Sequence, residues 1–196
     1  YVGHVFNNGF SVIDVRDPRA PRFVRHIPQP PGTWSQHLQT HGDILIVNNM
    51  CDMLKVETSG AFDPGAYYKG SVADKVKITA GERPYSAGMR IYDISDRANP
   101  REIAFFEVPG LGVHRTFWDG GDWVYFSALP PGFSDDIFMI ADFRRPERPE
   151  IVSQLWLPGM NVAAGETPHW DPKYRYALHH AIVKGDLAAA AWRDGG

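Results

Sequence analysis

A pattern of strand, tight turn and strand recurs three times along the chain. Each copy is an apolar stretch that ends at an Asp, and a Pro follows seven residues later. An Asp side chain accepts a bond from a nearby backbone N–H and Pro fixes φ, so the residues between the two strands favour a turn. The positions are Asp14 and Pro21, Asp93 and Pro100, and Asp142 and Pro149. We interpret these Asp residues as turn formers rather than catalytic acids.

A second element lies between these copies and also recurs three times. It consists of a His, then Gly-Asp, then a strand. The histidines are His37, His114 and His180, and the Gly-Asp pairs begin at Gly42, Gly121 and Gly185. The His-to-Gly spacings are 5, 7 and 5 residues. Because side chains alternate with a period of two along a strand, spacings that differ by two predict that the three imidazoles face the same way.

Together the two elements predict an all-β fold built of four-stranded antiparallel units, which are the blades of a β-propeller. Insertions at about 51–87 and 159–174 interrupt the repeat of this single domain, residues 1–196. The pattern predicts 13 strands, or three and a quarter blades. About four blades are needed for closure. We therefore expect part of a larger propeller, and favour this over self-association of two copies, because a ring of two copies leaves one strand of each unused.

Composition narrows the class of protein further. The 19 Gly, 16 Pro and 13% aromatic residues are typical of a turn-rich β protein. A net charge of −3 argues against nonspecific nucleic-acid binding, which needs a basic face. The apolar runs are too short for a membrane span. We expect a soluble protein; no signal peptide is visible in this partial chain, and its compartment stays unknown.

The pattern Ile/Val-Asp-Val/Ile-x-Asp-x-x-x-Pro is complete in Ile13-Asp14-Val15 through Pro21, and the second segment, Asp93 to Pro100, keeps both Asp residues and the Pro. This pattern resembles the LVIVD-repeat β-propeller family, and the resemblance spans most of the chain apart from the two insertions. The resemblance implies a propeller about twice as long, with another strand after Gly196 and further histidines in the remaining part. It implies a fold much more than a reaction.

The recurring histidines are the candidates for a metal site. In a propeller the first strand of each blade lies innermost, so His37, His114 and His180 would converge on the axis from successive blades. Three convergent imidazoles can bind Zn, Fe, Cu or Mn. The alternative is that each imidazole packs in its own blade and bonds a carbonyl. His179 competes with His180, because adjacent strand residues point to opposite faces, and the Gly-Asp spacing selects His180.

The insertion at 159–174 holds the other candidate catalytic residues. It should emerge at the rim of the axis, where loops carry function. Glu166 and His169 are candidates for an acid–base pair or further metal ligation, and Trp170 for the wall of a substrate pocket. The alternative is a Pro-rich surface loop with a solvated Glu and a packed Trp.

Arg115 follows His114 directly, so in a regular strand its side chain leaves on the opposite face. We expect it to form an ion pair between blades or, if the strand bulges here, to bind an anionic substrate.

Two functional hypotheses follow. The first is a metal-dependent propeller enzyme that acts on a small organic molecule, with hydrolase, lyase and oxidoreductase chemistry left open. The alternative is a non-enzymatic scaffold that binds a partner protein through its rim loops.

Overall fold

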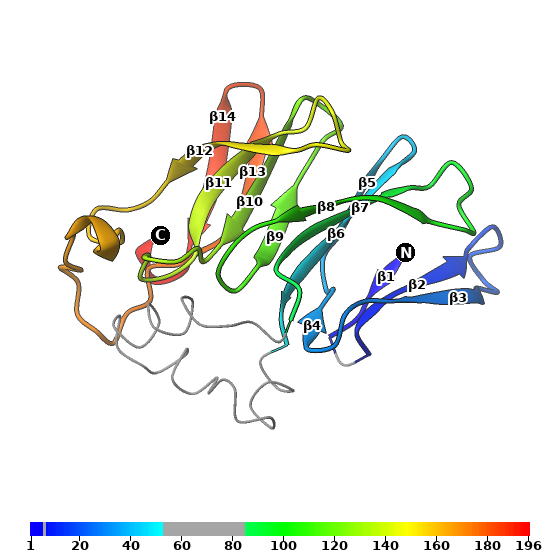
Figure 1. Cartoon of the computed structure of the whole chain (residues 1–196), viewed down its shortest axis with the longest axis horizontal. Coiled ribbons are helices and arrows are strands. Elements are labelled where there is room, and N and C mark those ends of the chain that lie inside the picture. The colour runs from blue at the N-terminus through cyan, green and yellow to red at the C-terminus, as the bar shows by residue number, and fades with distance from the viewer. Residues whose placement is uncertain (6, 53–84) are drawn as a thin grey trace.

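The structure, a computed structural model, describes residues 1–5, 7–52 and 85–196 (Figure 1). Most of the predicted insertion at 51–87 therefore lies outside the described residues. The described chain is all-β, with antiparallel sheets of which none is closed, and two short 3-10 helices, η1 (Val162–Ala164) and η2 (Arg193–Gly195). The predicted all-β, antiparallel architecture is confirmed. Among the residues described, no helix has the length and apolar character to cross a membrane.

Four sheets follow one another along the described chain, and we number them in chain order. Sheet 1 has β1 (Val2–Gly3), β2 (Gly9–Asp14) and β3 (Arg22–Pro28). Sheet 2 has β5 (Leu38–His41), β6 (Ile44–Cys51), β7 (Gly88–Asp93) and β8 (Arg101–Glu107), and the short β4 (Thr33–Trp34) pairs with the end of β6. Sheet 3 has β9 (Val113–Phe117), β10 (Trp123–Ala128), β11 (Ile137–Asp142) and β12 (Glu150–Leu155). Sheet 4 has β13 (Leu178–Lys184) and β14 (Leu187–Trp192).

The strands pair in the order that the repeat predicts, with β4 as the one addition. The turn Asp residues act as predicted: a carboxylate oxygen of Asp14, of Asp93 and of Asp142 accepts a bond from the backbone N–H two residues later, at 2.9–3.1 Å. Asp14 and Asp142 also bind an Arg at that position. The local sequence is therefore sufficient to place these hairpins.

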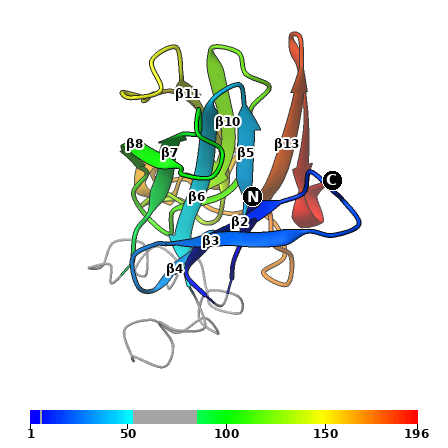
Figure 2. The ribbon, with the colours of Figure 1, turned by 90° about the vertical axis from the view of Figure 1, so that its right-hand side faces the viewer.

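The sheets pack face to face in chain order, as the turned view of Figure 2 also shows for sheets 1 and 2. Leu45 and Val47 of β6 join the cluster formed with Phe10 of sheet 1. Ile46, which points to the other face of β6, joins the main core, which runs through sheet 3 to Leu178 of sheet 4. Because both faces of the middle strands are buried, β6 and β11 contain continuous apolar runs, at 44–47 and 137–141, rather than alternating patterns.

A close approach of two backbones holds β9 beside β6. Gly112 forms an isolated bridge with Met50, and its φ of 90° lies in the left-handed region. A Cβ at Gly112 would stand 2.2 Å from the Asn49 carbonyl oxygen, so only glycine fits without a shift of the backbone. This contact brings the innermost strand of sheet 3 against sheet 2, where the candidate site lies.

Candidate functional site

The pairing register of the innermost strands decides which site residues are equivalent. We compare the units by counting from the Asp of each Gly-Asp pair. The fourth residue after this Asp is Val47, Phe126 or Ala190, and its partner on the innermost strand is Leu38, Thr116 or Ala181, respectively. The residues just before these partners are therefore equivalent, and they are His37, Arg115 and His180.

The predicted equivalence of His114 with His37 and His180 is thus wrong, and the equivalent residue of β9 is Arg115. The physical reason is the β9–β10 connection, which is longer than the two-residue turns of the other hairpins and shifts the register. A spacing that differs by two keeps the side-chain parity only when the extra residues lie in the strand itself.

A β-bulge occurs at the same place in β9 and β13. Ser127 pairs with Arg115 and Ala128 with Val113, so His114 is the extra residue of β9. In β13 the register likewise steps from Leu178 to His180, which leaves His179 as the extra residue. A bulge re-aims neighbouring side chains, and here it lets adjacent residues of one strand serve the same site.

The four histidines of the innermost strands form two pairs. The rings of His114 and His179 lie 5.3 Å apart between centroids, and those of His37 and His180 lie 5.7 Å apart. Sequence reasoning missed His179, because period-two alternation sends it to the opposite face from His180. The sequence signal for it is the His179-His180 doublet itself, in which a bulge makes both residues available.

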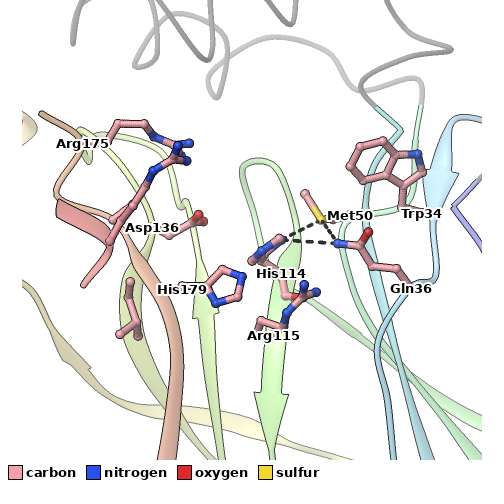
Figure 3. Close-up of a pocket in the computed structure, with 11 residues that line it drawn as sticks. Trp34, Gln36, Met50, His114, Arg115, Asp136, Arg175 and His179 are labelled. Atoms are coloured by element: carbon pink, nitrogen blue, oxygen red, sulfur yellow. Dashed lines mark hydrogen bonds between the residues drawn. The ribbon is translucent and has the colours of Figure 1, made fainter. Parts of the chain in front are cut away.

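A cavity of about 320 Å³ opens between sheets 2, 3 and 4 (Figure 3). His114, His179 and Arg115 line it, while His37 and His180 are absent from its described lining. The remaining lining residues are Trp34, Gln36, Met50, Asp136, Arg175, Ala177, Leu178 and Arg193. The cavity therefore joins the bulged strands to the end of β6, three segments far apart in the sequence.

Desolvation and the nearby Arg115 guanidinium lower the pKa of three of the four imidazoles. Desolvation lowers the pKa of His37 to about 4 and that of His114 to about 3, and the charge of Arg115 is the next cause in both cases. Desolvation and Arg115 also lower the pKa of His179. At neutral pH His37 and His114 are therefore neutral donors and acceptors near the Arg115 guanidinium.

The ring nitrogens of the histidines differ in their hydrogen-bond partners. The backbone N–H of Thr116 donates to His37 Nδ1 at 3.3 Å, and His37 Nε2 lies 3.2 Å from Nε2 of the Gln39 side-chain amide. The His114 Nδ1 atom lies 3.5 Å from Gln36 Nε2. The His180 Nε2 atom is buried and has no hydrogen-bond partner in the described part of the chain.

The predicted metal triad is not assembled in the described residues. Within 1–5, 7–52 and 85–196 no three His, Cys, Asp or Glu side chains are grouped as ligands for a metal ion. The His37 Nδ1 atom faces the backbone N–H of Thr116, so it can neither bind a metal nor donate a hydrogen bond there. A neutral imidazole binds a metal through one nitrogen while the other donates, which is not the arrangement of His37.

The insertion at 159–174 lies apart from the histidine pairs. The Glu166 carboxylate accepts from Gly159 N at 2.8 Å and Asn161 N at 3.0 Å, and also from the Trp156 indole. These hydrogen bonds hold the pKa of Glu166 below its usual value, and the bond from the Asn161 backbone has the largest effect. Glu166 therefore links the two ends of the loop from Gly159 to Glu166.

His169 and Trp170 of the same insertion pack edge to face, with 5.4 Å between their ring centroids. His169 is exposed, and Trp170 packs in turn on Tyr176 at 4.6 Å. Glu166, His169 and Trp170 are all absent from the described lining of the cavity. The structure therefore does not bring the predicted acid–base pair or the predicted pocket wall to the histidines.

A scan against protein-family models and a search of the curated proteins each found no match to this chain. The resemblance to LVIVD-repeat propellers accordingly stays a prediction based on the repeated turn motif.

Proposed function

We propose that this chain is part of a β-propeller that binds and acts on a small organic molecule in the cavity between its innermost strands. Face-to-face stacking of antiparallel sheets in chain order supports the propeller, since blades pack in this way. The contacts of β9 with β5 and β13 support it as well, because neighbouring blades meet through their innermost strands.

The observation that carries the proposal is the convergence of imidazoles and a guanidinium on one cavity. His114 and Arg115 come from β9 and His179 from β13, more than 60 residues away in the sequence. The volume of about 320 Å³ lies within the range of about 300–1,000 Å³ that is usual for small-molecule sites. Polar groups that converge on a partly apolar cavity are the usual features of such sites.

The test is a ligand-observed NMR screen of small organic molecules against the wild type and two variants. His179→Trp places a larger ring in the cavity, and His169→Trp is the matched control at an exposed histidine outside it. We expect compounds that bind the wild type and the control variant but lose their signal with His179→Trp. Equal binding to both variants, or no binding at millimolar concentrations, would overturn the proposal.

A metal-dependent enzyme is the second candidate, and the unpartnered buried Nε2 of His180 favours it. The predicted triad does not fit a metal, because His37 Nδ1 faces the Thr116 backbone N–H, so a metal would draw on His180 together with ligands from outside the described residues. We expect Zn, Fe, Cu or Mn in elemental analysis of the purified protein to be lost in His180→Ala and kept in His41→Ala. His41 is the control because it is exposed at the tip of the β5–β6 hairpin.

The partner-binding scaffold is the remaining hypothesis. Its longest predicted rim loop, at 51–87, lies mostly outside the described residues. Exposed apolar side chains on the outermost strands favour it, above all Phe23 of β3 and Leu155 of β12. A stable complex with a partner protein that is lost on Phe23→Ser would support this hypothesis over the small-molecule site.

A further inference from the structure

Arg115 is a half-buried cation without a counter-ion in the described chain. It lines the cavity, and among residues 1–5, 7–52 and 85–196 no carboxylate forms an ion pair with it. One guanidinium nitrogen donates to the His114 carbonyl at 3.3 Å, which is the only hydrogen bond that those residues give the guanidinium. The interblade ion pair expected for this residue is therefore missing from the described structure.

The groups around Arg115 do not neutralise its charge. Desolvation and the charge of Arg115 both lower the pKa of His37, His114 and His179, so these groups bring no negative charge to the guanidinium. Burial also lowers the pKa of Arg115 itself, which reflects the cost of removing a cation from water. A buried charge is usually paired, so a guanidinium left open to a cavity indicates an anionic ligand.

The charge of the cavity indicates how many negative charges the ligand carries. Of the two other lining arginines, Arg175 forms two bonds of 2.7 Å to Asp135, and Arg193 is exposed. The lining has three arginines, and the aspartates that can balance them are Asp136 of the lining and Asp135, the partner of Arg175. One positive charge is left over among the described residues, which matches a monoanion better than a dianion.

The part of the cavity opposite Arg175 is largely apolar, with Gln36 as its polar side chain. In Figure 3, Trp34 and Met50 lie across the cavity from Arg175, with Arg115 and His114 between them. Ala177 and Leu178 add further apolar surface to the lining. A ligand that fits this lining has one anionic end and an apolar body.

We propose that the cavity takes a small organic monocarboxylate, whose carboxylate binds the Arg115 guanidinium while its apolar part contacts Trp34 and Met50. A carboxylate matches the planar fork of a guanidinium, which can donate two parallel N–H bonds to it. This inference rests on the proposed small-molecule site and names the substrate class of that site.

The test measures binding of benzoate by NMR titration, with benzamide as the neutral analogue and inorganic phosphate as the more highly charged anion. We expect benzoate to bind the wild type more tightly than benzamide or phosphate does. Arg115→Met should weaken benzoate binding about 10- to 100-fold, as expected for loss of hydrogen bonds to a charged group. Arg115→Lys should keep part of the affinity, because the charge stays but the bidentate fork is lost.

Arg193→Met is the matched control, because Arg193 is another guanidinium of the lining but is exposed. It should weaken benzoate binding by less than about 5-fold, the usual effect of an exposed ion pair. Equal loss in Arg193→Met and Arg115→Met, or benzamide binding as tight as that of benzoate, would overturn the carboxylate inference. Preferential binding of phosphate would overturn it in favour of a dianion.

The outcomes for the two proposals are distinguishable. If neutral compounds bind the wild type but not His179→Trp, and benzoate does not bind, the carboxylate inference fails and the small-molecule site stands. If no compound responds to His179→Trp, both fail. A thermal unfolding curve for each variant separates loss of binding from loss of fold, and Arg115→Lys supplies the answer if Arg115→Met does not fold.

Discussion

A buried side-chain hydrogen bond crosses the contact between sheets 2 and 3 beside the site. The Thr116 hydroxyl of β9 donates to the Asn48 Oδ1 atom of β6 at 2.7 Å, and both residues are about 1% exposed. Thr116→Val keeps the shape of the side chain and removes only the donor. Because Asn48 Oδ1 would then be buried without its partner, the expected cost is about 1–3 kcal/mol.

This cost can be converted into a thermal shift. For a domain of this size, each kcal/mol lowers the melting temperature by about 2–4 °C. A loss of about 2 kcal/mol for Thr116→Val therefore predicts a decrease of about 4–8 °C. Thr40→Val is the matched control, because Thr40 is exposed on β5, and its effect should stay within about 0.5 kcal/mol.

The decisive measurement is a double-mutant cycle by urea unfolding. Asn48→Leu alone should also destabilise, since it leaves the Thr116 hydroxyl without its acceptor. The double variant Thr116→Val/Asn48→Leu replaces both partners with apolar groups, so its loss should be smaller than the sum of the single losses by about 1 kcal/mol or more. Strict additivity, or a loss in Thr116→Val no larger than in Thr40→Val, would refute the reasoning.

Two further variants test the loop and turn assignments. Glu166→Ala removes the acceptor of Gly159 N–H and Asn161 N–H, so amide hydrogen exchange at these residues should rise while ligand binding in the cavity is unchanged; lost ligand binding with unchanged exchange would instead support the predicted catalytic role of Glu166. Bonds from Arg144 lower the pKa of Asp142 to about 2 from its ordinary 3.8. Because the folded-state pKa is the lower one, the stabilisation is present above about pH 4 and is lost as the pH falls to about 2. The difference in unfolding free energy between wild type and Asp142→Asn should therefore shrink over that window, and a difference that does not change with pH would contradict this assignment.

The candidate site was predictable only in part. Arg115 and His114 could be singled out from the sequence, because the Gly-Asp element marks the preceding strand as innermost. His179 was excluded by period-two alternation, and Trp34 and Met50 carried no motif. These residues reach the cavity through the bulges and through the approach of β6 to β9, which depend on contacts between segments distant in the chain.

By itself the sequence determined the strands, their order and their turns. Asp14, Asp93 and Asp142 form their turns through bonds to backbone two residues away, so the information needed is local. Apolar runs such as β6 then determine which strands are buried on both faces. These are short-range effects, and they recur wherever the same residues recur.

Only the tertiary structure decided which side chains meet. A longer turn before β10 and a bulge at His114 put Arg115, rather than His114, in register with His37 and His180. A shift of one residue reverses the face of a side chain in a strand, yet its cause lies in the pairing with a neighbouring strand. The chemistry of the cavity, with a guanidinium that no carboxylate of the described residues pairs, is therefore a property of the assembled sheets.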